Sequence, residues 1–522
     1  MVLPPSKARG RYESLKAARQ PFIDRARKCA ELTLPHLFPE HETETSSTSF
    51  KTPYQSIGAR GVNSLSSKLL MSQLPANAPF FRLKLSDADI RAIGSEKEKG
   101  KVEEGLAVIE RTVLDELETK ALRVSVYEGL RMLLIGGNAL LVWEQDGPPR
   151  VFRLDRYVVK RDPMDNVLEM ITHETVAPAA LPEGFLEALR ESQVDAGQPV
   201  ESLETKKTLD LYTHMQLVGN RWKSYQEVGG VVVPDSTKTY PKDKCPWLPL
   251  RFNRVQGEDY GRGLVEEYYG DLRSLETLTK AIVQGSAAAA KILLLVRPNG
   301  STKVKEVRDA QNGAIISGDA NDVTILQMNK YADFRVAKEL MAEMEARLAA
   351  SFLMNSSVQR DGERVTAEEI RFMAQELETA LGGLYSVLSV ELQKPLVTLM
   401  LNELQRTNRI PNLPGNRVKL QITTGIEALG RGAELTKLMH FIKLLEPFGP
   451  ETLAREMNLS DYIARVGANL GIDTAGLIKS AEQKAQEAQA QQQQMQQSQM
   501  MDLAGKATPN VIKGMVDGQK QQ

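Results

Sequence analysis

The sequence contains very little cysteine. It has two residues, Cys29 and Cys245, in a chain of 522 residues. Two thiols so far apart in sequence do not form the dense disulfide framework of small secreted proteins, and they exclude zinc sites built from several cysteines. We therefore expect a protein of a reducing compartment, long enough to be stabilised by a large buried core.

Long apolar runs are also missing. The stretch 130–143 contains Arg131, and the stretch 287–296 contains Lys291. Both are shorter than the roughly 20 apolar residues that a membrane-spanning helix needs. Nothing at the N-terminus resembles a signal peptide. These features favour a soluble cytoplasmic protein.

The chain has no excess of charge of either sign. Its 66 Lys and Arg residues nearly balance 67 Asp and Glu residues, for a formal net charge of −1. Proteins that hold nucleic acid tightly use clustered cations to displace counterions from phosphate. The composition therefore disfavours tight DNA binding, but it is compatible with a surface past which DNA moves.

Recognisable catalytic and cofactor motifs are absent. Residues 94–101 resemble a phosphate-binding loop, but they have one residue too many between the glycines, and Val102 stands where Ser or Thr should be. Residues 260–267 begin like a dinucleotide loop, but Glu266 replaces the last glycine. We interpret them as a helix start and a turn before a helix. The five histidines have no metal-ligand spacing: His36, His41, His173, His214 and His440. The prediction is no catalytic residue, no metal and no cofactor, although carboxylates that meet only in space stay open.

Apolar periodicity predicts helices at 6–34 and 55–74, and two or three more within 86–137. From Asn138 to about residue 255 the pattern changes to short β-branched and aromatic segments separated by turn signals, which predicts one meander of antiparallel strands. A polar, helix-prone insert at 180–205 interrupts it.

The second half is predicted to be mainly helical. One long helix is expected at 261–293, a small α/β unit with strands at ILLLV, AIISG and VTILQM at 292–330, and a return helix at 331–355. A helix at 367–406, bent at Gly382, Gly383 and Pro395, precedes a strand at 417–425, short helices to 480 and a glutamine-rich tail. The fold class is therefore α+β, predominantly α-helical. The small residues 285–290 either only favour helix or allow helices to crowd together.

A charged loop, VQRDGER (358–364), separates the return helix from the next one, whose start carries a capping box formed by Thr366 and Glu369. This order of parts resembles the portal, or head-to-tail connector, proteins of short-tailed bacteriophages. Four stretches carry the resemblance: PFIDRARKCAELTLPHLFP (21–39), NSLSSKLLMSQLPANAPFFRL (63–83), EDYGRGLVEEYYGDLRSLETL (258–278) and VQRDGERVTAEEIR (358–371).

The resemblance implies a portal fold with wing, stem, clip and crown around a central channel. Residues 1–261 and 366–428 then correspond to the wing, 262–291 and 331–354 to the two stem helices, and 292–330 to the clip. Residues 355–365 correspond to the channel loop, 429–480 to a helical crown, and 481–522 to a glutamine-rich flexible tail.

The family also implies roles for particular residues. The channel-loop residues that would face DNA are Gln359, Arg360, Asp361, Gly362, Glu363 and Arg364. Thr366 and Glu369 would anchor the end of this loop. Facing partners in the clip would be Lys303, Lys305, Glu306, Arg308 and Asp309. The residues that would pack the two stem helices together are Leu272, Leu275, Leu278, Ile282, Met341, Met344 and Leu348.

Such a protein forms a homo-oligomeric ring, normally of twelve copies, at one capsid vertex of the virion. The resemblance implies that double-stranded DNA passes through it, and that its partners are the terminase, tail adaptor and tube proteins, major capsid and scaffolding proteins, and internal core proteins. Two alternatives stay open: an enzyme acting on nucleotides or nucleic acid through an unrecognised site, and a helical scaffold or adaptor.

Overall fold

The computed structural model describes residues 8–40, 49–75, 80–85, 96–145, 147–195, 208–289, 293–326, 331–354, 380, 387–413, 418–422, 438–445, 447, 462–463 and 466. The chain divides into two units, Met1–Ala428 and Leu429–Gln522. Each unit is described by itself.

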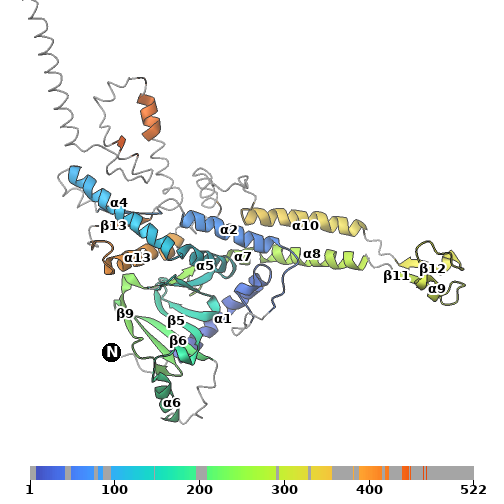
Figure 1. Cartoon of the computed structure of the whole chain (residues 1–522), viewed down its shortest axis with the longest axis horizontal. Helices are drawn as coiled ribbons and strands as arrows, with labels where there is room; N and C mark the ends of the chain where they lie inside the picture. Colours follow the sequence, from blue (N-terminus) through green and yellow to red (C-terminus); the bar gives the residue numbers. More distant parts are fainter. Residues whose placement is uncertain are drawn as a thin grey trace, which may run out of the picture. The chain divides into compact units, whose positions relative to one another are not determined.

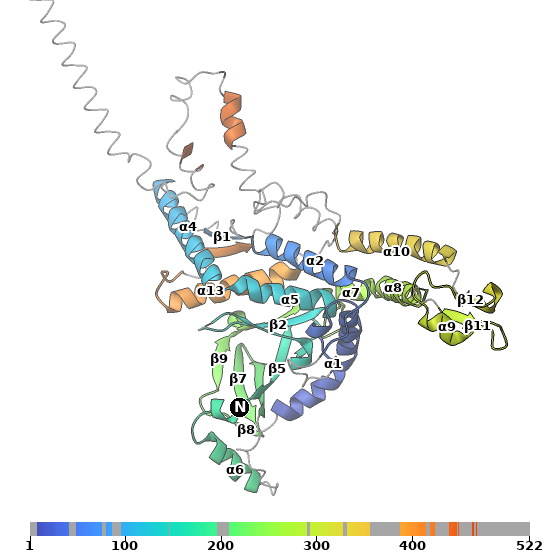
Figure 2. The same cartoon turned by 45° about the vertical axis from the view of Figure 1, so that its right-hand side comes forward.

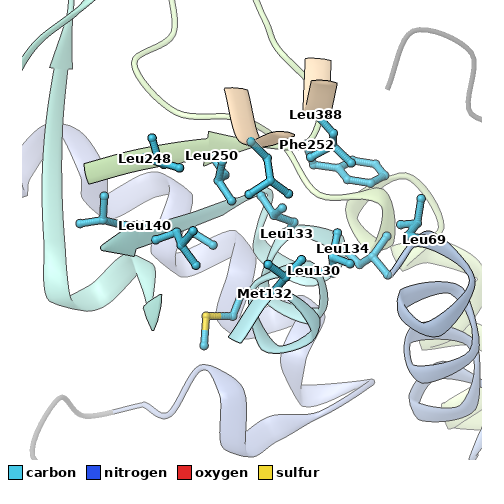
Figure 3. Packing of buried hydrophobic residues seen from close by; sticks show 14 of the residues in the cluster. Leu69, Leu130, Met132, Leu133, Leu134, Leu140, Leu248, Leu250, Phe252 and Leu388 are labelled. Atoms are coloured by element: carbon cyan, nitrogen blue, oxygen red, sulfur yellow. The ribbon is translucent and has the colours of Figure 1, made fainter. Parts of the chain in front are cut away.

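The first unit contains a core of packed helices. Its N-terminal helices are α1 (Ala8–Glu31), α2 (Ile57–Gln73), α4 (Glu96–Thr119) and α5 (Leu122–Gly136). Helix α5 packs against α1, α2 and α4 and buries most of its side chains. Figure 3 shows its leucines between Leu69 of α2 and the strand residues Leu140, Leu248 and Leu250. The helices predicted over 6–34, 55–74 and 86–137 are confirmed.

The strands of this unit form several antiparallel sheets. A three-stranded sheet has the order β10 (Trp247–Arg251), β2 (Asn138–Val142) and β3 (Arg150–Phe152). In a six-stranded sheet, β4 (Tyr157–Arg161), β5 (Val167–Val176), β6 (Leu209–Val218) and β7 (Arg221–Val228) are consecutive, and both β8 (Val231–Val232) and β9 (Lys238–Pro241) pair with β7. The predicted antiparallel meander is confirmed for β4 to β8, but β2, β3 and β10 form a separate sheet. The short turn Leu154–Arg156, with Leu154 and Asp155 buried, leads the chain from one sheet into the other.

Helix α1 covers one face of the six-stranded sheet (Figure 2). Tyr12 and Leu15 of α1 form a small apolar cluster with Ile171, Tyr212 and Tyr225 of the sheet. Because side chains alternate along a strand, the neighbouring residues point to the opposite face. Helix α6 (Phe185–Asp195), inside the insert predicted at 180–205, packs against β8 at one end of this sheet.

A two-stranded sheet joins distant parts of the chain. Strand β1 (Phe81–Leu85) pairs antiparallel with β13 (Val418–Ile422), from Phe81 opposite Ile422 to Leu85 opposite Val418. The closing strand predicted at 417–425 is thus confirmed. Its partner β1 was not predicted, because the sequence indicated only a helix break there.

The second half of this unit begins with a helix that is interrupted. Helix α7 (Leu264–Glu267) ends at Tyr268, and α8 (Tyr269–Ala289) follows, so the prediction of one continuous helix at 261–293 was wrong. At the interruption the Tyr268 ring lies 6.1 Å from the Phe352 ring, centroid to centroid.

The elements that follow are β11 (Leu293–Val296), α9 (Val304–Asp309), β12 (Val323–Leu326) and α10 (Tyr331–Ser351), as Figure 1 shows. The strand predicted at AIISG (314–318) is wrong: β11 pairs with β12, and Ile315 is fully exposed. The predicted return helix is confirmed as α10.

The last helix of the first unit starts in an unusual way. A π-helical turn, η6 (Ser389–Gln393), leads directly into α13 (Lys394–Arg406), which has Pro395 in its first turn. The bend predicted at Pro395 therefore coincides with a change of helix type. Gly382 and Gly383 lie outside the described residues.

In the second unit the structure describes a helical segment at 438–445 and a few helical residues near 462. The Tyr462 hydroxyl donates a hydrogen bond of 3.2 Å to the Leu438 carbonyl. In the parts of both units that are described, no helix is apolar over a length that would cross a membrane.

Candidate functional site: the helical hairpin and its terminal lobe

Helices α8 and α10 pack together and form what we call the helical hairpin (Figure 1). Each has 21 residues and is therefore about 30 Å long. Residues 293–326, between the two helices in sequence, form what we call the terminal lobe. The hairpin contains the seven residues predicted to pack the stem, and the lobe contains the five residues predicted to face partners.

The base of the hairpin is fixed to α2. Phe352, just after α10, is fully buried, and a Cβ atom on Gly61 of α2 would lie 2.5 Å from its ring. Glycine at position 61 therefore lets the ring reach the helix backbone. The Glu276 carboxylate of α8 accepts hydrogen bonds of 3.0 and 3.1 Å from the backbone N–H groups of Tyr54 and Gln55. The base is thus held by both apolar packing and hydrogen bonds.

Burial decreases along the hairpin towards the lobe. Leu272, Leu275 and Leu348 near the base are fully buried. The other predicted stem residues, Leu278, Ile282, Met341 and Met344, are only half-buried. Farther on, apolar side chains are exposed in the single chain: Val283, Val336 and Leu340. Among the described residues, the hairpin therefore carries apolar surface that no other part of the chain covers.

Gly285 bears on one question that the sequence left open. A Cβ atom at this position would lie 2.9 Å from the Phe334 ring of α10. The small side chain thus allows a close approach of the two hairpin helices. At Gly285 the small side chain therefore has a packing role within one chain, and the crowding of many helices around residues 285–290 stays a prediction.

The terminal lobe has a polar centre. Among its described side chains, only Thr302 and Asp322 are buried. The Asp322 carboxylate accepts hydrogen bonds of 3.2 Å from the Thr302 backbone N–H and from the Ser301 hydroxyl. A Cβ atom on Gly300 would overlap this carboxylate, and one on Gly318 would overlap the Thr302 hydroxyl. The two buried side chains that are described in the lobe are therefore joined by hydrogen bonds, and we call this group around Asp322 the polar kernel.

The kernel gives the lobe a predicted sensitivity to acid. Withdrawal from water opposes ionisation of Asp322, but hydrogen bonds from the Thr302 N–H and the Ser301 hydroxyl hold its pKa below the usual range. Because the pKa of Asp322 is lower in the folded protein than the ordinary carboxyl value of 3.8, its ionised form stabilises the lobe above that pH. This stabilisation is lost as the pH falls from 3.8 through the lower pKa of the folded state. We expect backbone amides of the lobe to lose protection below about pH 4, as hydrogen exchange with correction for intrinsic rates would measure.

The matched control is Asp322→Asn, in which protection of the lobe should be weak and should no longer change with acid. Equal protection of the wild-type lobe at pH 6 and at about pH 3 would contradict the role given to this carboxylate.

The predicted partner-facing residues lie on and beside α9. Lys303, Lys305, Arg308 and Asp309 are exposed, and Glu306 is partly exposed. They pair with each other: Lys303 Nζ lies 3.4 Å from Glu306 Oε1, and Arg308 Nε lies 2.8 Å from Asp309 Oδ1. The result is a charged surface with little net charge.

The predicted channel-loop residues, Gln359 to Arg364, and their anchors Thr366 and Glu369 lie outside the described residues. Their roles stay predictions. Within the part of the chain that the structure describes, no cluster of three or more His, Cys, Asp or Glu side chains is arranged to hold a metal ion.

A buried ionic network that centres on Arg251 was not predicted from the sequence. Arg251 of β10 is 2% exposed, and its Nη2 lies 2.8 Å from Glu391 Oε1 in the π-helical turn. Its Nη1 lies 3.2 Å from Asp165 Oδ1. Hydrogen bonds with Arg251 and Arg254 lower the pKa of Asp165 against the effect of burial. No sequence signal joins residues 165, 251 and 391, because their proximity depends on the folded chain.

Comparison with known proteins gives the family. The model of a family described as bacteriophage head to tail connecting protein matches residues 6–478. The chain belongs to this family. It is 42% identical to the portal protein of Escherichia phage T7, over 92% of this chain and 89% of that protein. It is also 42% identical to the portal protein of Enterobacteria phage T3, over 91% of this chain and 89% of that one.

The family and its α+β, mainly helical fold confirm the resemblance seen in the sequence. A head-to-tail connecting protein belongs to the virion, with the head on one side and the tail on the other. Among solved structures, the neck of an empty gene transfer agent particle resembles the chain at 12% identity and a TM-score of 0.35, with 80% of this chain and 90% of that chain covered.

Proposed function

We propose that this head-to-tail connecting protein forms a closed ring at one capsid vertex. Double-stranded DNA passes through the ring's channel during packaging and ejection. The ring has no chemistry of its own. It binds the terminase first and the tail adaptor afterwards, and it also contacts capsid, scaffolding and internal core proteins.

The observation that best supports a ring is the uncovered apolar surface of the hairpin. Val336 is 62% exposed and Val283 is 48% exposed, whereas Leu272 and Leu348 are fully buried. Exposed apolar stripes on soluble proteins generally mark interaction sites. When one contact is repeated between identical subunits and the rotation closes, each hairpin is covered by its neighbours.

In this proposal the hairpin helices are the stem, residues 292–330 are the clip, and residues 1–261 and 366–428 are the wing. The exposed α9 charges, Lys303 to Asp309, then face the terminase and the tail adaptor. Residues 429–480 form the crown and 355–365 the channel loop, with 481–522 as a tail.

The experiment that tests the ring is native mass spectrometry combined with electron microscopy of the purified protein. Closed rings with countable symmetry, twelve copies being the family expectation, would support the proposal. A stable monomer at micromolar concentration would oppose it. ATP hydrolysis or nuclease activity that copurifies with the protein would favour the enzyme alternative.

The channel loop has its own test. We expect deletion of residues 359–364 to leave ring assembly intact and to reduce packaged or retained DNA, because Arg360 and Arg364 touch phosphate while Asp361 and Glu363 keep the contact weak. Packaged DNA per particle is the measurement. A normal phage yield from the deletion would contradict this role.

A further inference from the structure

A groove lies on the face of the six-stranded sheet opposite α1. It consists of two adjoining hollows of about 740 and 500 Å³, which share Trp143, Arg150, Lys238 and Tyr240 among their lining residues. We call the two together the sheet groove. Its first hollow is closed on one side by α13, through Leu399 and Arg406. None of the roles assigned above uses it.

The wall of the second hollow follows from strand alternation. Ile171, Tyr212 and Tyr225 face α1. Their neighbours Thr172, Thr213 and Gln226 line the groove instead. These three lie in one row across the sheet, Thr172 opposite Thr213 and Thr213 opposite Gln226. The groove therefore offers hydroxyl and amide groups along its floor.

The first hollow combines aromatic walls with cations. Trp143 and Tyr240 stand beside Pro246 and Leu399. Three of the charged lining groups already have partners: Glu403 Oε1 lies 2.8 Å from Lys120 Nζ, and Arg150 pairs with Glu174 and lies 3.9 Å from Glu144 Oε1. Glu403 also accepts a hydrogen bond of 2.8 Å from the Trp143 indole N–H.

Three other cations line this hollow and have no such partner among the described residues. In the described part of the chain, the side chains of Lys238, Lys244 and Arg406 take part in no ion pair or hydrogen bond, although all three line the first hollow. Lys244 and Arg406 line only the first hollow, whereas in the second hollow Lys238 is accompanied by the carboxylate of Asp235, which has no ion-pair partner among the described residues. The electrostatic asymmetry suits a ligand with negative charge at one end and neutral side chains at the other.

A polypeptide fits this asymmetry better than nucleic acid does. A nucleic-acid strand carries a phosphate at every nucleotide and needs many neutralising contacts. Here Glu144 and Glu403 stand among the cations, and Glu174 and Asp235 line the second hollow. Glu403 and Glu174 are already paired with Lys120 and Arg150, so only three unpaired cations of the described chain are available to a ligand, and the unpaired Asp235 would repel a phosphate in the second hollow. An extended peptide can place its acidic residues only beside the three cations.

We propose that the sheet groove binds an extended acidic segment of a second protein. Its carboxylates pair with Lys238, Lys244 and Arg406. Its apolar side chains pack against Trp143 and Tyr240, and its polar groups meet the row formed by Thr172, Thr213 and Gln226. Recognition of acidic motifs by clustered cations is an established mode of peptide binding.

The test uses the full chain and a fluorescein-labelled decapeptide that is rich in Glu and Asp in one half and in Leu and Thr in the other. Fluorescence anisotropy should show binding that the variant Lys238→Glu, Lys244→Glu, Arg406→Glu weakens by about tenfold or more, since each reversal turns an attraction into a repulsion. The control variant Lys28→Glu, Lys51→Glu, Arg60→Glu changes three exposed cations outside the groove and should bind as the wild type does.

Native mass spectrometry of the same samples counts the copies, so loss of ring assembly is distinguished from loss of peptide binding. Equal binding to the groove variant would overturn the proposal. So would binding of a DNA duplex that depends on the same three cations, or peptide binding by the monomer that disappears in the ring, which would assign the groove to a neighbouring copy.

Discussion

Replacing Glu391 by alanine is expected to lower the free energy of unfolding by about 3–5 kcal/mol, because it leaves the buried guanidinium of Arg251 without its main partner. Glu391 accepts hydrogen bonds from the Arg251 backbone N–H at 3.1 Å and from its Nη2 at 2.8 Å. Urea unfolding followed by the fluorescence of the three tryptophans measures the loss. All three, Trp143, Trp222 and Trp247, lie in the apolar core to which β10 also contributes.

The matched control is an exposed pair of the same chemistry. In Arg308 and Asp309 the side chains are 70% and 53% exposed. Asp309→Ala should therefore change stability by less than about 1 kcal/mol. Similar small effects for both variants would mean that the π-helical turn does not depend on the buried pair.

Replacing Phe352 by alanine is expected to cost about 3–5 kcal/mol, because it opens a cavity where the hairpin meets α2. The Phe352 side chain is fully buried and contacts Gly61 and Tyr268. Hydrogen exchange should show loss of protection in α10 near Leu348 before it appears in the six-stranded sheet.

Val336→Ala provides the comparison, since this side chain on the same helix is 62% exposed and its truncation should cost less than about 0.5 kcal/mol in the unassembled chain. Gly61→Ala tests the other side of the contact. The new Cβ atom would overlap the Phe352 ring and should lower the free energy of unfolding by about 1–3 kcal/mol. The double variant Gly61→Ala, Phe352→Leu should cost less than the sum of Gly61→Ala and Phe352→Leu measured separately. Simple additivity would show that the two residues do not share one contact.

The periodicity of apolar residues was sufficient to predict the long helices. The stripe that includes Leu272 and Leu275 predicted a helix, and that helix exists. It could not predict the interruption at Tyr268, because the pattern of apolar residues continues through it. The interruption accompanies a contact with Phe352, 84 positions later in the sequence, which periodicity does not report.

Strand pairing was harder to predict for the same reason. The alternation of Phe81, Leu83 and Leu85 is short, and its partner β13 begins only at Val418. The division into two sheets depends on a turn at 154–156 that has no glycine or proline. Isolated strand signals therefore indicated the strands but not which of them would pair.

The candidate site divides in a similar way. The sequence predicted the hairpin, the lobe and their charged and apolar residues by pattern and by resemblance. It gave no sign that Thr302 and Asp322 would meet, or that Arg251, Glu391 and Asp165 would form a buried network. Such contacts join residues whose proximity is decided by the whole fold, and the polar residue types involved are common on any surface.

The polar kernel of the terminal lobe has a consequence for how such proteins diversify. A domain held by an apolar core limits its outer surface, because many exposed positions also support the packing beneath them. In the lobe, the hydrogen bonds around Asp322 and the two close-packed glycines, Gly300 and Gly318, specify the chain path with few residues. The side chains of α9 and of residues 310–317 take no part in the hydrogen bonds around Asp322, so we expect substitutions there to leave the chain path of the lobe unchanged.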